Sequence, residues 1–298
     1  MMLWSSLWDM TQEAQISAVE YSNFLLSHLR AEKDFKIIDF VLKTLEGRPD
    51  RLGLLSYYHT DESIGSISEQ EFRIKLESFL KQLLIKSVPE SDFQKRYFDA
   101  FVKVIESAPA QTYLENILAN KESLSGLEVD QDRRWHIINR LAALDYQNID
   151  LLIKNEGARD PSGQGLENAI GARAARPGIQ NKQEWFNKLF SDASMSLAQQ
   201  KAAMENMFSI EQTGFRKQMD NLFFSKIFEV AKNKESSFQE VYTESLPPGA
   251  CDDESLLKLR NFLAGASGLT PIMIKNLKIN IQENDRCLQV KKRMLLAN

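Results

Sequence analysis

Apolar residues recur at helical spacing along most of the chain, whereas the alternation expected of a β-strand is nearly absent. Within 37–45, for example, the apolar side chains fall on one face of a helix. Ser17 and Glu20 have the spacing of a capping box, in which each side chain accepts a hydrogen bond from the other end of the first helical turn. This pattern predicts an all-α fold.

The predicted helices follow one another closely, and short connections join them. The periodicity yields roughly fourteen helices, and Pro247–Gly249 is the clearest break between them. Such a succession favours antiparallel helix pairs stacked into an irregular, HEAT-like superhelical array. No boundary is strong enough to divide the chain, so we expect a single all-helical domain over residues 1–298.

Composition and charge argue against several classes of protein. The chain of 298 residues is 43% hydrophobic and 26% charged, which is typical of a folded globular protein. Its net charge is −4, and its only compact cationic run, Lys291–Arg293, suits the C-terminal end of a helix. No apolar run approaches the ~20 residues of a membrane span. We therefore expect no nucleic-acid partner and no membrane partner.

The amino terminus and the cysteines suggest a cytoplasmic protein. The opening segment, 1–10, lacks the basic start and the long apolar core of a secretory signal. Cys251 and Cys287 lie far apart, without a CxxC partner or a histidine at ligand spacing. These features predict two buried, reduced thiols in a reducing compartment.

A series of short motifs occurs between Gly126 and Trp185. The motif residues are Gly126, Leu127, Asp130, Asp132, Arg134 and Trp135, then Arg140–Leu144, Asp160–Gly165, Ala172–Pro177, and Lys182 with Trp185. In order and rough spacing these motifs resemble the C-terminal helical domain of the aminopeptidase N family of zinc metallopeptidases, the gluzincin aminopeptidases. Weaker similarity extends toward both ends of the chain, although 207–212 departs from the family's Phe-Trp-Gln-Pro-type turn.

The resemblance implies a supporting role. In the family, the C-terminal helices form a curved bowl that closes over the active site. The chain would therefore pack against the catalytic domain of the same polypeptide, cap the active-site chamber and limit access to peptides that can thread in. The parent would be a zinc-dependent aminopeptidase, which removes N-terminal residues from peptides.

The sequence lacks the family's zinc-binding motif. His-Glu-x-x-His places two histidine ligands one helical turn apart, but His28, His59 and His136 include no such pair. Ala202–Asn206 resembles the family's Gly-x-Met-Glu-Asn motif, yet it follows the other motifs and lies in a predicted helix, so we interpret the match as coincidence. We expect no catalytic, cofactor-binding or metal-binding residue here, no enzymatic activity of this chain alone, and zinc only in the catalytic domain that this sequence lacks.

Several arginines could bind a peptide carboxylate, because a guanidinium offers paired donors. The interpretation that we favour is that they tie helix ends and turns together. In it, Asp130 and Asp132 pair with Arg134, and Asp160 pairs with Arg159 or Arg173. No substrate-binding residue can be assigned from the sequence. The arginines are Arg133, Arg134, Arg140, Arg159, Arg173 and Arg176.

A free-standing helical-repeat scaffold that binds a protein partner is the alternative. The end of such an array carries a polar cap, whereas the opening here is apolar at Leu3, Trp4 and Trp8. The opening therefore favours the enzyme domain over the scaffold.

Overall fold

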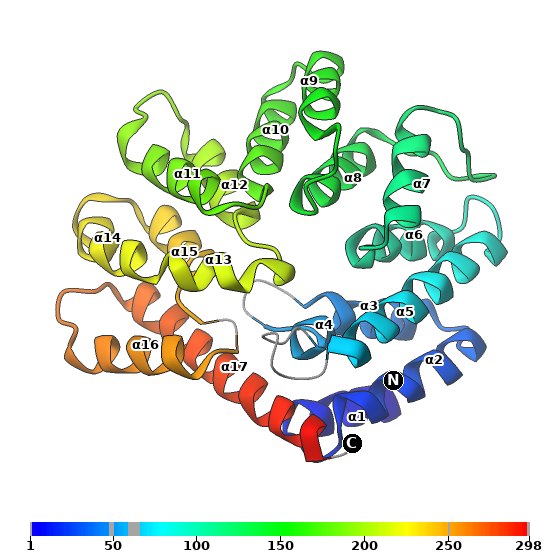
Figure 1. The fold of residues 1–298 in the computed structure, drawn as a ribbon, viewed down its shortest axis with the longest axis horizontal. Helices are drawn as coiled ribbons and strands as arrows, with labels where there is room; N and C mark the ends of the chain where they lie inside the picture. The colour runs from blue at the N-terminus through cyan, green and yellow to red at the C-terminus, as the bar shows by residue number, and fades with distance from the viewer. Residues whose placement is uncertain (1, 48–50, 59–65, 250, 297–298) are drawn as a thin grey trace. The chain divides into compact units, whose positions relative to one another are not determined.

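The computed structural model describes residues 2–47, 51–58, 66–249 and 251–296. Within these residues the chain is helical and has no β-strand, which confirms the predicted all-α class (Figure 1). The stacking of helix pairs into HEAT-like repeats and a curved bowl stays a prediction. The α-helices are α1 (Met2–Gln12), α2 (Ala18–His28), α3 (Phe35–Glu46), α4 (Leu54–Tyr58), α5 (Ser66–Lys86), α6 (Asp92–Val104), α7 (Ala108–Leu118), α8 (Gln131–Ala143), α9 (Ile149–Arg159), α10 (Gly163–Ala175), α11 (Ile179–Ser191), α12 (Leu197–Asn206), α13 (Thr213–Gln218), α14 (Asp220–Asn233), α15 (Ser236–Ser245), α16 (Asp253–Gly265) and α17 (Pro271–Leu296), with 3-10 turns η1 (Leu29–Ala31) and η2 (Ile210–Gln212).

The helices group into two compact units. Unit 1 comprises residues within 1–48, 52–137 and 289–298, and unit 2 comprises residues within 49–51 and 138–288. The boundaries fall inside α8 and α17, so each of these helices contributes residues to both units. The single domain over 1–298 stays a prediction.

Unit 1 begins with a helix whose tryptophans face inward. Trp4 and Trp8 are buried and pack on aromatic rings of unit 1, with centroid separations of 4.9 Å and 5.3 Å respectively. By contrast, Met2 is 85% exposed and Leu3 is 61% exposed. Packing within unit 1 thus accounts for the two tryptophans, which no longer discriminate between an enzyme domain and a free-standing scaffold.

The capping box predicted at the start of α2 is confirmed. The backbone N–H of Ser17 donates to Glu20 Oε2 at 2.7 Å, and Ser17 Oγ accepts a hydrogen bond from Val19 N at 3.2 Å. These bonds satisfy backbone donors that have no partner within the helix.

A buried glutamate of α5 fixes the start of α7. Glu77 accepts hydrogen bonds from the backbone N–H groups of Glu106 at 2.6 Å and of Ser107 at 2.9 Å. Ser107 is the N-cap residue of α7, so a carboxylate of α5 meets the positive end of α7.

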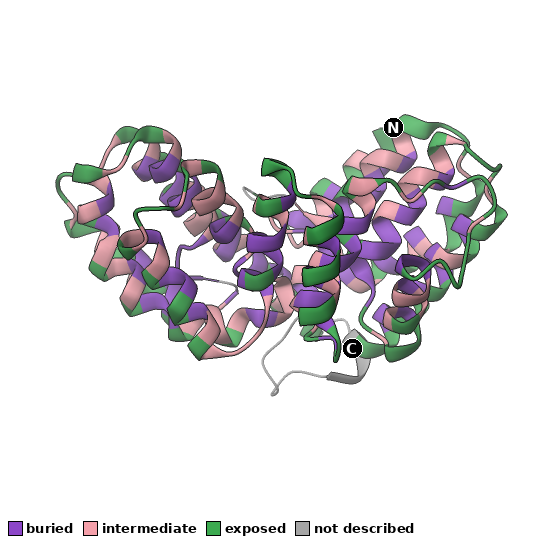
Figure 2. Cartoon of the chain, turned by 90° about the horizontal axis from the view of Figure 1, so that it is seen from above, coloured by how far each residue is buried: buried purple, intermediate pink, exposed green. Residues whose placement is uncertain are grey.

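In unit 2, α10 and α12 approach each other closely through small residues. Ala169, Ala172 and Ala175 of α10 are buried, as predicted for a helix with a near neighbour. A Cβ atom added at Gly171 would lie 2.8 Å from Asn206 Nδ2 of α12. Figure 2 shows buried residues along the inner faces of the helices within each unit.

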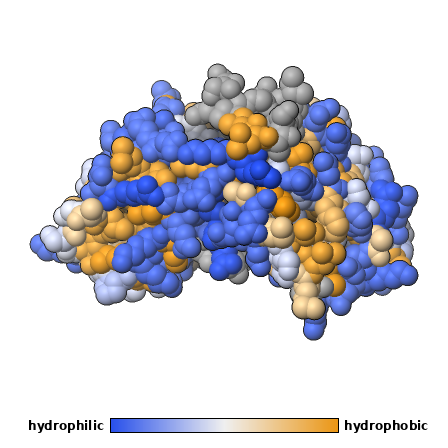
Figure 3. Space-filling model, turned by 90° about the horizontal axis from the view of Figure 1, so that it is seen from below, coloured by the Kyte–Doolittle hydropathy of each residue, from blue (hydrophilic) through white to orange (hydrophobic). Residues whose placement is uncertain are grey.

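The core of unit 2 includes an aromatic cluster around Tyr242. Its ring is stacked on Phe223 at a centroid distance of 4.9 Å, and its hydroxyl donates to the Phe223 carbonyl at 2.7 Å. Burial raises the pKa of Tyr242 well above its usual value, so the phenol stays neutral and keeps this hydrogen bond. The face drawn in Figure 3 has hydrophilic and hydrophobic side chains interspersed.

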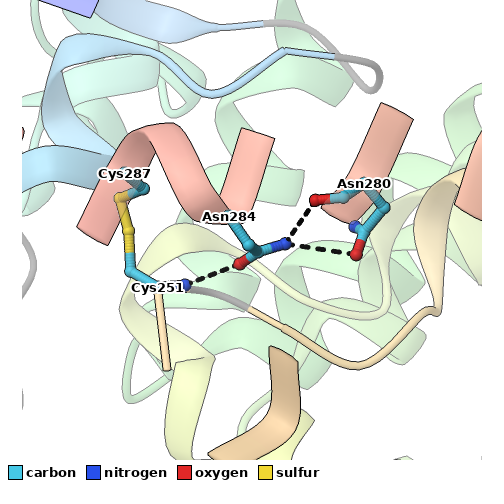
Figure 4. The surroundings of a disulfide bond; sticks show 4 residues. All are labelled: Cys251, Asn280, Asn284 and Cys287. Atoms are coloured by element: carbon cyan, nitrogen blue, oxygen red, sulfur yellow. Dashed lines mark hydrogen bonds between the residues drawn. A yellow bond between two sulfur atoms is a disulfide. The ribbon is translucent and has the colours of Figure 1, made fainter. Parts of the chain in front are cut away.

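The cysteines form a disulfide, and the prediction of two reduced thiols is wrong (Figure 4). The bond joins the connection between α15 and α16 to α17, across 36 residues of sequence, with the Cα atoms of Cys251 and Cys287 5.5 Å apart. The linear spacing conceals this pairing, because only the packing of α17 on the connection brings the two residues together.

Candidate functional site

Motif residues of unit 2 meet where α8 and α10 end. Gln212 Nε2 donates to the carbonyl of Ala143 at 2.9 Å and to that of Ala175 at 2.8 Å. The last carbonyl groups of a helix lack partners within it, so a single amide here caps two helices. We call this meeting point of Ala143, Ala175 and Gln212 the capped junction.

Lys182 of α11 is the second cap of the junction. Its ammonium donates to the carbonyls of Ala174 at 2.9 Å and Ala175 at 3.1 Å. The residue is 0% exposed, although lysine is among the residues least often buried. The negative end of the α10 dipole supplies the compensating charge. Lys182 therefore has a structural partner inside the fold.

Burial and a neighbouring cation weaken the charge of Lys182. Desolvation, with a smaller contribution from nearby Arg216, lowers the pKa of Lys182 to about 7. Both cations face the ring of Phe208, with Lys182 Nζ 5.6 Å and Arg216 Cζ 5.2 Å from its centroid. The aromatic face partly offsets the repulsion between them.

Asn181 completes the end of α10. Its side-chain amide donates to the carbonyls of Arg173 at 3.1 Å and of Arg176 at 2.8 Å. Pro177 cannot donate a backbone hydrogen bond, and Gly178 has a φ of +104°, which favours glycine. The Ala172–Pro177 motif is thus a helix ending in which side chains replace the missing helical bonds.

Two motif arginines secure the same region through ion pairs. Arg140 Nη2 lies 2.7 Å from Glu211 Oε1, and its Nη1 lies 3.1 Å from the other carboxylate oxygen. Arg176 bridges Asp145 at 3.1 Å and Asp150 at 2.8 Å. For Arg140 and Arg176 these contacts agree with the interpretation that the arginines tie helix ends and turns together. Whether any of the six arginines contacts a substrate stays open.

The first motif residues lie in unit 1 and are also structural. Arg133 pairs with Asp130 at 2.7 Å and with Asp99 at 2.9 Å. Asp130, which was expected to pair with Arg134, thus has the adjacent Arg133 as a partner. Arg134 is buried and donates to the carbonyl of Leu118 at 3.1 Å. This part of the motif therefore fixes α8 to the end of α7 and to α6.

The structure shows no metal site in the residues that it describes: no three or more His, Cys, Asp and Glu side chains come together there. His28 Nδ1 lies 2.9 Å from the carbonyl of Phe24, and His136 is exposed on α8. His59 lies outside the described residues. Ala202–Asn206 belongs to α12, which confirms its predicted helical setting.

Sequence reasoning missed Asn181 and Gln212. Gln212 lies in the segment that departs from the family's usual turn, yet its amide makes the hydrogen bonds that connect α8 to α10. A glutamine directly before a short helix carries no local signal of capping helices that are distant in sequence. Asn181 could have been suspected, because it follows Pro177 and Gly178 at the end of a predicted helix.

Taken together, the geometry defines a helical packing domain whose motif residues stabilise helix ends. Residues 1–280 match the ERAP1-like C-terminal domain family, so the chain belongs to this family. It is also 22% identical over 265 residues to aminopeptidase N of Streptomyces lividans. That similarity covers 88% of this chain but 29% of the length of the relative. The chain is a C-terminal domain of an aminopeptidase N family protein, as the motifs indicated.

Proposed function

We propose that this domain packs against the catalytic domain of the same polypeptide, caps the active-site chamber and limits which peptides reach it. The parent would be a zinc aminopeptidase that removes N-terminal residues from peptides. The observation that carries the proposal is the family match over residues 1–280.

The capped junction supports a scaffold role. Its buried cation and its amides donate to carbonyls of α8 and α10, and its arginines pair with carboxylates of unit 2. Groups used in this way hold helices in place and have fewer donors left for a substrate. In this proposal the parent's chemistry comes from the catalytic domain.

The residues that the structure describes offer no zinc site. The described part of the structure brings together no set of three candidate ligands, and the sequence has no pair of histidines at the zinc-binding spacing. We therefore assign zinc to the catalytic domain and no step of the reaction to this chain.

Two experiments test the proposal. The chain alone should give a strongly helical circular dichroism spectrum, bind no stoichiometric zinc and leave amino-acid anilides uncleaved. Stoichiometric zinc together with anilide turnover would contradict the non-catalytic role.

The access role needs the parent enzyme. The catalytic portion with and without this domain should be compared on a series of peptides of increasing length. We expect the preference for particular lengths to weaken when the domain is removed, while cleavage of a small anilide persists. An unchanged length profile in a folded, active truncation would overturn the capping role.

The cytoplasmic location expected from the sequence stays a prediction. Among the described residues, none of the helices combines the length and apolar character that crossing a membrane demands. The disulfide between Cys251 and Cys287 favours a different compartment.

A further inference from the structure

Cys251, in the connection between α15 and α16, is attached to α17 by two interactions. One is the disulfide from Cys251 to Cys287. The other is Asn284, one helical turn before Cys287, whose Oδ1 accepts a hydrogen bond from Cys251 N at 2.8 Å (Figure 4). Asn284 is oriented in turn, because its Nδ2 donates to the carbonyl of Asn280 at 2.8 Å.

Gly249 and Cys251 of this connection both have positive φ angles. Gly249 has a φ of +134°, and a Cβ atom there would lie 2.5 Å from Asn284 Nδ2. Cys251 itself has a φ of +61°, a value that residues other than glycine adopt only occasionally. Such backbone conformations persist where surrounding contacts hold them.

We call the contact of Cys251 with Cys287 and Asn284 of α17 the joint. The joint also positions α16. Asp252 follows Cys251 and is the N-cap residue of α16, with Oδ1 accepting from Ser255 N at 2.8 Å and Oδ2 lying 3.0 Å from Lys217 Nζ of α13. Ser255 Oγ donates to buried Asp220 of α14 at 2.8 Å. Restraining Cys251 therefore restrains the start of a helix that contacts α13 and α14.

The disulfide is shielded from solvent. Cys251 is 9% exposed and Cys287 is 0% exposed. A thiolate must approach a sulfur atom to reduce a disulfide, so reduction here requires the joint to open first. A regulatory disulfide has the opposite property, because a redox partner must reach it in the folded protein.

We propose that the bond between Cys251 and Cys287 is a permanent structural cross-link and that this protein folds and works in an oxidising compartment. Disulfides of this kind form and persist there and are rare in a reducing cytoplasm. The bond forms by thiol–disulfide exchange: the two thiols give two electrons and two protons to the disulfide of an oxidising partner protein, which leaves as a dithiol.

The first test is the thiol state in host cells. Cells are quenched in acid, and free thiols of the denatured full-length protein are trapped with a maleimide of known mass. We expect peptides carrying Cys251 and Cys287 to remain unlabelled and to become labelled after reduction. Labelling of both cysteines before reduction would overturn the oxidising compartment.

The second test separates a structural cross-link from an exposed switch. The purified oxidised protein is treated with dithiothreitol in buffer and in urea, and labelling at both cysteines is followed in time. We expect reduction to be at least about tenfold slower in the folded protein, because the joint must open first. Equal rates would contradict the shielded cross-link. This test uses the natural sequence, so no variant needs to fold.

Discussion

Arg140 and Glu211 form a two-point ion pair within unit 2, although 71 residues separate them in the sequence. Their side chains are 9% and 13% exposed. Low exposure strengthens the attraction, and it also means that either charge left alone would be poorly solvated. The pair therefore holds the segment before α13 against α8.

Removing one partner of this pair should be costly. We expect Arg140→Ala to lower the free energy of unfolding by about 3 kcal/mol, because Glu211 is left shielded without its cation. Urea unfolding followed by far-UV circular dichroism measures the change. The control is Glu184→Gln, which breaks the exposed pair with Lys188 and should cost at most about 0.5 kcal/mol. Equal losses in the two variants would refute the prediction.

Lys182 should make stability depend on pH. Its pKa is about 7 in the folded chain, below its ordinary value of 10.5, so between these values the unfolded chain binds one more proton. Stability should therefore rise with pH in this window, by up to about 1.4 kcal/mol per pH unit, while the full cost of burying the cation remains at lower pH.

The variant Lys182→Met should remove this rise. Urea midpoints measured from pH 7 to pH 10, the window that the pKa of Lys182 defines, provide the comparison. Lys188→Met serves as control, because Lys188 is a solvent-accessible lysine of the same helix. Parallel pH profiles for the natural chain and Lys182→Met would show that Lys182 keeps an ordinary pKa.

Gln212 should matter more than its place in a short 3-10 turn suggests. Gln212→Ala leaves carbonyls at the ends of α8 and α10 with fewer donors, and we expect a loss of about 1–3 kcal/mol. Gln218→Ala is the matched control, since its exposed amide donates only within α13 and the change should stay within about 0.5 kcal/mol. Thermal denaturation of the two variants measures these losses. A similarly small fall in melting temperature for both variants would contradict the stabilising role of Gln212 at the capped junction.

Two glycines should respond oppositely to alanine. Gly249→Ala should destabilise the chain by about 1–3 kcal/mol, because its φ is +134° and Asn284 occupies the space of a Cβ atom. Gly157→Ala should stabilise it by up to about 1 kcal/mol, because Gly157 lies inside α9 with open space around it. Melting temperatures that fall for both variants, or rise for both, would contradict this pair of expectations.

Loss of the cross-link should be measurable in its own right. Replacing Cys251 and Cys287 together by serine should lower the free energy of unfolding by about 2–5 kcal/mol, since the bond restricts the unfolded chain across 36 residues. Urea titration of the oxidised natural chain and of the double variant gives the difference. Coincident curves would mean that the bond contributes nothing to stability.

Local features could be predicted from the sequence because they depend on neighbours within a few residues. The helical class, the capping box at Ser17 and Glu20, the helix that holds Ala202–Asn206, and the close packing surface of α10 follow from spacing and residue size. The motifs between Gly126 and Trp185 also indicated the family, which the match over residues 1–280 confirms.

Tertiary structure alone decided which distant groups meet. The pairing of Arg140 with Glu211, the capping of α8 and α10 by Gln212, and the disulfide of Cys251 join residues separated by 71, 69 and 37, and 36 positions respectively. Helix periodicity repeats every few residues and specifies which face is buried, but it does not specify the helix that covers that face. The partners of a buried charge or thiol are therefore set by how the helices pack.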